Sequence, residues 1–310
     1  MKAVPFVKLQ ITSTKRKNKF KKWKSDYWWG YAFITPPFIG IALFTLYPLI
    51  QSLYMSFTNF DFSGPPQFIG FDNYKKLLFN DPMVWKTLVN TFYAALVVPI
   101  SIAVSLFMAI LLNQPIKGRN FFRSLFFLPS ISSVVAMGLI WKWIFNPDFG
   151  LLNYVLGLIG INGPNWTNDI RWAMPAMVIQ GVWAGLGMNI ILYLAALNNV
   201  PTELYEAATV DGANSWHKFW YITVPSISPV TFFILITSLI AALQDFPRFM
   251  IVTGGGPNYA TTTIVYYLYT TAFQYSQMGY ASALAWFLGV IIMAVVLLNF
   301  LYSKKWVYYD

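Results

Sequence analysis

The sequence predicts an all-α, polytopic membrane protein with six transmembrane helices. Its 310 residues are 57% hydrophobic and only 10% charged, whereas soluble domains carry about 25% charged residues. The mean hydropathy is +0.53. Six stretches reach the roughly 20 mostly apolar residues that a helix needs to cross a bilayer. These observations place the chain in the membrane class and argue against an ordinary soluble domain.

The six predicted spans follow one another along most of the chain. The first is too long for the apolar core of a signal peptide and lacks a small-residue cleavage site, so we expect it to be retained. The last ends shortly before the C-terminus. The expected bounds of the spans are 31–54, 88–112, 124–145, 173–197, 226–247 and 282–302.

The placement of basic residues sets the expected orientation, because cytoplasmic loops are enriched in lysine and arginine. Alternating spans put fifteen of these residues on one side, nine of them within the first 24 residues, and six on the other side. We therefore expect a basic cytoplasmic tail at 1–30, a six-span domain at 31–302 and a cytoplasmic C-terminus at 303–310. A basic tail beside a membrane span fits anionic lipid better than nucleic acid.

The chain offers little for catalysis or for ion coupling. It has no cysteine and one histidine, His217, which we interpret as a surface or interface residue. No G-x-x-x-x-G-K-[ST] phosphate loop occurs, and the spans hold few of the ionisable residues that proton- and sodium-driven carriers use. The sequence thus predicts neither an enzyme nor an autonomous pump. If the protein drives a solute uphill, we expect the energy to enter from a partner.

A polar unit at 201–225 stands between the fourth and fifth spans, on the predicted cytoplasmic side. Pro201 suits the first turn of a short helix, and Gly212 accepts the left-handed backbone of a helix C-cap. Ser215 is the expected cap of a second short helix at 216–222. The unit fits a surface connector, and it also fits a helix that docks into a groove of a partner. Four apolar residues of the first helix are expected to share one face: Leu204, Tyr205, Ala207 and Ala208.

The spacing within this unit resembles a family signature. Glu206-Ala207-Ala208 is followed after three residues by Gly212, and after nine more by Ile222, one residue and Val224-Pro225. This pattern is similar to the EAA motif of ATP-binding-cassette import permeases, in which leucine stands at the position of Val224. Other segments, spread over about residues 30–305, resemble the carbohydrate-uptake branch of that family: Phe127-Leu128-Pro129, Ile140-Trp141-Lys142-Trp143, Asn146-Pro147, Gly150-Leu151-Leu152-Asn153, Trp183, Leu194-Ala195-Ala196-Leu197, Pro201 and Thr253-Gly254-Gly255-Gly256-Pro257.

The resemblance implies a permease subunit of an ATP-driven, binding-protein-dependent importer in a bacterial cytoplasmic membrane. Such a subunit forms half of the pathway for a sugar or oligosaccharide and moves it by alternating access. The implied partners are a second homologous permease, two cytoplasmic ATPase subunits that bind ATP and Mg, an extracellular or periplasmic solute-binding protein, the sugar and membrane lipid, with no nucleic acid. No cofactor or metal is expected in this chain. The residues implied in coupling to the ATPase are Glu206, Ala207, Ala208, Asp211 and Gly212.

The expected solute pathway lies along spans three, four and five. Transporter sites lie near the bilayer midplane, and amide, carboxylate and aromatic side chains in spans four and five suit sugar hydroxyls and rings. Alignment with the family adds several small residues, which fit helix packing equally well. We therefore expect a wide passage, with selectivity set by a partner. The pathway candidates are Ser130, Gly181, Trp183, Gly185, Met188, Ser238, Gln244 and Asp245.

Two alternatives stay open at this point. One is the same type of importer carrying a glycerol-phosphate-like or other polar solute. The other is a membrane anchor whose unit at 201–225 docks a partner without transport. A neighbouring gene for a second EAA permease and another for a secreted binding protein would favour the importer over the anchor.

Overall fold

The computed structural model describes residues 15–115 and 117–308. The first 14 residues of the predicted basic tail lie outside this range, as do residues 116, 309 and 310. The chain divides into two compact units, Met1–Tyr54 and Met55–Asp310. Within the described residues the regular secondary structure is helical, apart from an isolated antiparallel bridge between Thr58 and Phe68. This confirms the predicted all-α class.

The first unit is a run of helix. It consists of α1 (Lys15–Ile41), the π-helical turn η1 (Ala42–Leu46) and most of α2 (Tyr47–Ser56). The apolar part, Tyr27–Ser56, is 30 residues long with a mean hydropathy of 1.8. At about 1.5 Å per residue this is long enough to cross a bilayer.

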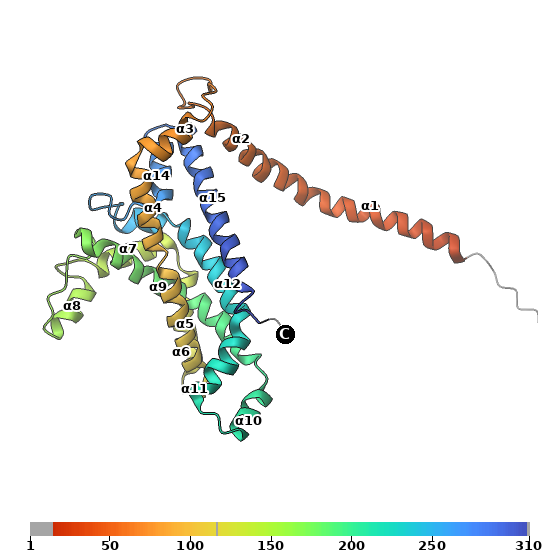
Figure 1. The fold of residues 1–310 in the computed structure, drawn as a ribbon, viewed down its shortest axis with the longest axis vertical. Coiled ribbons are helices and arrows are strands. Elements are labelled where there is room, and N and C mark those ends of the chain that lie inside the picture. Colours follow the sequence, from red (N-terminus) through yellow and green to blue (C-terminus); the bar gives the residue numbers. More distant parts are fainter. Residues whose placement is uncertain (1–14, 116, 309–310) are drawn as a thin grey trace, which may run out of the picture. The chain divides into compact units, whose positions relative to one another are not determined.

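The second unit carries the remaining helices (Figure 1). Four segments within it are long and apolar enough to span a membrane: Pro82–Asn113, Ile170–Asn198, Ser215–Leu243 and Met278–Ser303. Together with the first unit the described residues hold five such segments, or six if the bent pair α6 and α7 counts as one span. The helices are α3 (Asp72–Lys75), η2 (Lys76–Asn80), α4 (Pro82–Ala94), α5 (Val97–Asn113), α6 (Arg119–Ile131), α7 (Val134–Ile144), α8 (Leu151–Leu158), α9 (Ile170–Asn198), α10 (Thr202–Val210), α11 (Ser215–Lys218), η3 (Phe219–Thr223), α12 (Val224–Leu243), α13 (Pro247–Val252), α14 (Ile264–Tyr269), η4 (Thr270–Gln274) and α15 (Met278–Ser303).

The third predicted span differs from the expected single helix at 124–145. It consists of α6 and α7, whose axes are bent by 106°. The backbone is extended at Ser132 and Ser133, with ψ of 149° and 133°. Pro129, which lacks an N–H, lies just before the break. Serine pairs and proline are common causes of sharp helix bends.

Three helices form the centre of the second unit. α5 packs along α9, and α12 contacts both. One buried cluster at this junction includes Ala109, Ile190, Tyr193 and Ile227. Burying such side chains between helices fixes the three axes against one another. Further helices pack on this centre or on one another, with α6 against α9, α15 against α12 and α14 against α4.

Hydrogen bonds to Asp81 join three segments that are far apart in the sequence. Asp81 is the N-cap of α4, and its Oδ2 accepts hydrogen bonds from the hydroxyls of Tyr267 and Tyr280, both at 2.6 Å. Burial, together with the hydrogen bond to the Asp81 carboxylate, raises the pKa of Tyr267 well above its ordinary value. Hydrogen bonds to a charged acceptor are stronger than neutral ones, so these two bonds hold α4, α14 and α15 together.

Candidate functional site

The unit at 201–225 folds as a helix, a turn and a second helix. α10 begins after Pro201 and ends in a glycine cap, where Gly212 has φ of 77°. The N–H of Ala213 donates to the carbonyl of Ala208 at 2.8 Å, and that of Gly212 to Thr209 at 3.1 Å. This is the hydrogen-bond pattern of a Schellman motif, which requires the left-handed backbone that glycine adopts without strain.

The second helix begins one residue earlier than predicted. Asn214, not Ser215, is the N-cap of α11, because its side chain accepts a hydrogen bond from the N–H of His217 at 2.9 Å. Ser215 is the first helical residue. Asparagine caps a helix at least as well as serine does, so the prediction of Ser215 was wrong by one position.

The predicted single apolar face of α10 is divided between two sides. Leu204 and Ala207 are exposed, whereas Tyr205 and Ala208 are half-buried. The Tyr205 hydroxyl lies 2.9 Å from the hydroxyl of Thr223, at the end of η3. The expectation was wrong because the side of the short helix that carries Tyr205 faces η3 and the buried cluster formed by α5, α9 and α12. Glu206, beside Ala207, is exposed.

The unit is braced to the helices at the centre of the fold. Tyr205 and Ile222 pack against the buried cluster formed by α5, α9 and α12. Lys218 donates to the Thr209 hydroxyl at 2.6 Å, which links the two short helices. The outward side carries large exposed apolar residues, including Val210 and Trp216, which are 89% and 67% exposed. The unit therefore combines a braced inner side with an open outer side.

A cavity of about 780 Å³ lies between α5, α9 and α12, away from the unit. Five of the predicted pathway residues line it: Gly181, Gly185, Met188, Ser238 and Asp245. They come from α9, α12 and the segment just after α12. The glycines allow close approach, since a Cβ on Gly185 would lie only 3.0 Å from the Ser101 hydroxyl oxygen of α5.

Three other predicted pathway residues lie elsewhere. The Ser130 hydroxyl donates to the carbonyl of Phe127 at 2.6 Å, and the residue lies against Gly187 of α9. Gln244 is the exposed C-cap of α12. Trp183 meets Trp141 edge to face, with 5.4 Å between ring centroids. The structure thus does not bring these three into the cavity.

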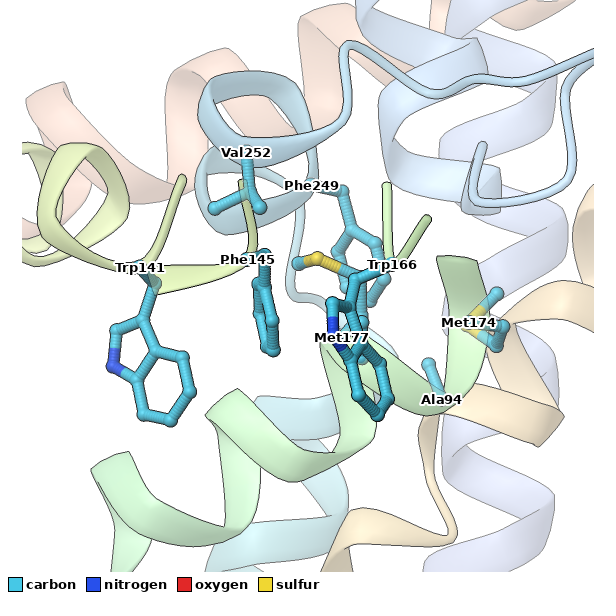
Figure 2. Packing of buried hydrophobic residues seen from close by; sticks show 9 residues of the cluster. Ala94, Trp141, Phe145, Trp166, Met174, Met177, Phe249 and Val252 are labelled. Carbon is cyan, nitrogen blue, oxygen red and sulfur yellow. The ribbon is translucent and has the colours of Figure 1, made fainter. Parts of the chain in front are cut away.

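Trp183 is partly buried and packs against an aromatic cluster. Figure 2 shows the buried residues of this cluster, in which Phe145 lies between Trp141 and Trp166. The contacts join α7, α9 and α13 and the loop before α9. Trp183 also lines a separate, apolar cavity of about 300 Å³ beside α6 and α7. Its position fits packing of the bent pair against α9.

The central cavity contains further residues besides the five predicted candidates. The Asn189 amide donates to the Ser101 hydroxyl at 3.2 Å, and both residues are buried. Arg248 pairs with Asp245, with 2.6 Å between Nη2 and Oδ2. A lone amide in an apolar span and an arginine three residues after an aspartate were the available signals. Other lining residues include Val97, Phe233, Thr237 and Ala242.

The described part of the chain contains no group of three or more His, Cys, Asp or Glu side chains that could hold a metal ion. The cavity instead offers hydroxyls, one amide, one ion pair and apolar walls. Such a lining can exchange hydrogen bonds with a polar solute and contact its apolar faces.

Comparison with known proteins agrees with this arrangement. The chain is similar to the "Probable ABC transporter permease protein YesP" of Bacillus subtilis (strain 168), with 40% identity over 91% of this chain and 92% of the relative. It is similar to the "Arabinooligosaccharides transport system permease protein AraP" of the same organism, with 36% identity over 89% of this chain and 87% of the relative.

A solved structure has the same fold. It is a chain from the "Crystal structure of bacterial alginate ABC transporter in complex with alginate pentasaccharide-bound periplasmic protein". The TM-score is 0.79 and the sequence identity 26%, over 90% of this chain and 95% of that chain.

A family model described as "Binding-protein-dependent transport system inner membrane component" matches residues 101–306, which is more than half of the chain. The match includes the unit at 201–225 and almost the whole lining of the central cavity. This chain therefore belongs to the family of binding-protein-dependent transport system inner membrane components.

Proposed function

We propose that this chain is the permease subunit of an ATP-driven importer and forms half of a pathway for a sugar or oligosaccharide. The observation that carries the proposal is the bracing of the unit at 201–225 to α5, α9 and α12, whose other faces line the central cavity. A force applied to the outer side of the unit therefore reaches the cavity walls through packed side chains. Alternating access needs such a connection, because the two states of the pathway must differ in their fit to the energy source.

The proposed coupling surface is the outer side of α10 and the turn after it. Glu206 and Ala207 are exposed and available to a partner. Asp211 and Gly212 form the glycine cap, so they hold the shape of the turn. Ala208 is half-buried, and its carbonyl accepts the closing hydrogen bond of that turn. We assign the two exposed residues to contact with the ATPase and the other three to the geometry of the docking unit.

The proposed solute class is a saccharide. The relatives support it, since one is named for arabinooligosaccharides and a solved neighbour is described with an alginate pentasaccharide. The cavity supports it as well, because Ser238 and Asp245 can exchange hydrogen bonds with sugar hydroxyls while Phe233 offers an apolar ring face. The lining fits this solute class better than a glycerol-phosphate-like anion, because its one cation is already paired with Asp245.

The proposed assembly contains a second homologous permease, two ATPase subunits that bind ATP and Mg, and a solute-binding protein. In this assembly α10 and α11 face the cytoplasm, both termini lie on the same side, and the protein is embedded in a bacterial cytoplasmic membrane. The family description, which names a binding-protein-dependent system and an inner membrane component, supports this arrangement.

Reconstitution tests the proposal. The complete importer is placed in proteoliposomes, and the uptake of a labelled glycan retained by the cognate binding protein is measured with and without ATP. We expect ATP-dependent uptake that requires both permeases and the binding protein. If the ATPase docks on the unit but no solute enters, the chain is a membrane anchor and the proposal fails.

A further inference from the structure

The charge of the central cavity is confined to one ion pair. Among the described residues that line the cavity, the charged ones are Asp245 and Arg248. Arg248 places Nη2 at 2.6 Å and Nε at 2.7 Å from the same carboxylate oxygen, Oδ2 of Asp245. The two side chains are only 12% and 22% exposed. At this separation and burial each charge largely cancels the field of the other, so the lining is close to neutral.

Each nitrogen of the Arg248 guanidinium has a partner within the protein. Its third nitrogen, Nη1, donates to the carbonyl of Met177 in α9 at 2.5 Å. Gly181, one turn further along α9, provides the space, because a Cβ at that position would collide with Nη1 and with Val97. The Arg248 side chain therefore lies against α9 at Gly181, where the absence of a Cβ leaves room for Nη1.

The carboxylate of Asp245 keeps one oxygen available. Oδ2 accepts both bonds from Arg248, while Oδ1 accepts no hydrogen bond from any side chain or N–H of the described residues. Ser238, near the end of α12, also lines the cavity. An ionised carboxylate is only an acceptor, which matches a donating hydroxyl and repels another carboxylate.

We propose that Asp245 accepts a hydroxyl hydrogen bond from an uncharged saccharide, and that Arg248 is a positioning residue that holds this acceptor in place. An anionic sugar finds no unpaired cation here, and its carboxylate meets Oδ1 of Asp245, an acceptor that lacks a donor within the described residues. The pair thus selects neutral over uronate-containing solutes. This inference rests on the proposed function of a saccharide importer and adds the charge class of its substrate.

The test compares two probes that differ in charge. Plant cell-wall polysaccharide is hydrolysed, labelled and separated by anion exchange into a neutral and a uronate oligosaccharide fraction. Uptake from each fraction is measured in proteoliposomes that contain the complete importer and its binding protein. We expect uptake from the neutral fraction only. Uptake from the uronate fraction overturns the inference and leaves the proposed function standing. If labelled sugar accumulates in the proteoliposomes equally without ATP, or if no sugar enters from either fraction, the proposed function is overturned as well.

Variants separate charge selection from simple packing. Asp245→Asn frees the cation of Arg248, so we expect neutral uptake to fall about tenfold or more and the purified complex to retain the uronate fraction, which the wild type does not. In the double variant Asp245→Asn/Arg248→Gln the cation is gone, and we expect uronate retention to disappear again. Asp72→Asn is the matched control, because Asp72 forms an i,i+3 pair with Lys75 on the surface.

A structural role for the pair gives a different result. It predicts that Asp245→Asn and the double variant lose uptake equally and that neither retains uronates. That outcome, or unchanged uptake in Asp245→Asn without uronate retention, overturns the assignment. Retention is measured on the detergent-purified complex with its ATPase subunits bound, so a variant with very low uptake still gives an answer.

Discussion

Replacing Gly212 tests whether the turn after α10 transmits force. Gly212 has φ of 77°, and no atom lies within 4 Å of the position that a Cβ would take. A substitution there thus changes the backbone energy without causing a clash. Gly160 is a matched control, because it also has φ of 77°, open space around it and the same pair of closing hydrogen bonds, at the end of α8.

The magnitudes follow from the backbone geometry. Alanine in a left-handed conformation costs about 1–2 kcal/mol. Proline fixes φ near about −65° and removes the N–H that bonds Thr209, so it costs about 3 kcal/mol or more. If the ATPase binds only the correctly folded unit, its apparent affinity falls in proportion to the folded fraction, and about 1.4 kcal/mol lowers the folding equilibrium constant of the turn by a factor of about ten. The affinity thus falls by up to about tenfold for Gly212→Ala and up to about a hundredfold or more for Gly212→Pro.

The assay measures ATP hydrolysis and solute uptake in reconstituted importer, together with membrane insertion of each variant. We expect both glycines to tolerate insertion, and only the Gly212 variants to lose stimulation of ATP hydrolysis by loaded binding protein. Normal stimulated hydrolysis in Gly212→Pro would refute the coupling role. An equal loss in Gly160→Pro would show that any broken helix cap lowers activity, and the specific reasoning would fail.

Four further predictions follow from contacts in the second unit. Asp81→Asn weakens the two tyrosine hydrogen bonds and lowers the free energy of unfolding by about 1.5–3 kcal/mol, measured by thermal unfolding in detergent; an unchanged midpoint would contradict this. The pKa of Tyr267 is raised in the folded state, so the neutral hydroxyl stabilises the fold fully below the ordinary tyrosine pKa of about 10, and this stabilisation is lost as the pH rises above that value. The thermal midpoint of Tyr267→Phe should therefore fall less than that of the wild type between about pH 9 and 12. Gly181→Ala should displace the guanidinium seated there, costing about 1–3 kcal/mol and lowering uptake, whereas Gly157→Ala, in open space on a helix, should be neutral or stabilising. Trp183→Ala should lower stability by about 1–3 kcal/mol without changing the preference for neutral over uronate probes, because the ring packs on Trp141 outside the central cavity.

The sequence predicted the fold class and the family because both depend on signals that survive without tertiary contacts. Apolar length identifies a span, and the EAA spacing identifies the family, whose model match confirms the importer permease and a transport subunit in place of an enzyme. The glycine cap at Gly212 was predictable too, since the left-handed backbone there favours one residue type. The expected cytoplasmic side of the termini stays a prediction.

The features that sequence reasoning missed depend on neighbours in space. The 106° bend between α6 and α7 leaves each half apolar, so a hydropathy pattern reads it as one span. The division of α10 into two sides arises because Tyr205 reaches Thr223, eighteen residues away. An aromatic side chain such as Trp183 is typical of a sugar site, but in the fold its ring packs against Trp141. Arg248 was visible as a partner of Asp245, yet its seat on Met177 and Gly181 is a contact across 71 residues.

The Arg248–Met177 contact links the proposed solute site to the proposed coupling unit. In the proposed coupling, a force on the unit at 201–225 reaches both α9 and α12, because both are packed into the cluster that holds Ile222. The Arg248 side chain, just after α12, bonds the backbone of α9. A relative shift of these helices would therefore pull the guanidinium from Met177 and change the position of Asp245. In the proposed importer, Asp245 is held as acceptor for the solute only while α9 and the end of α12 keep one register. A motion that starts at the proposed ATPase and shifts these helices would therefore weaken the hold on the solute as it opens the pathway.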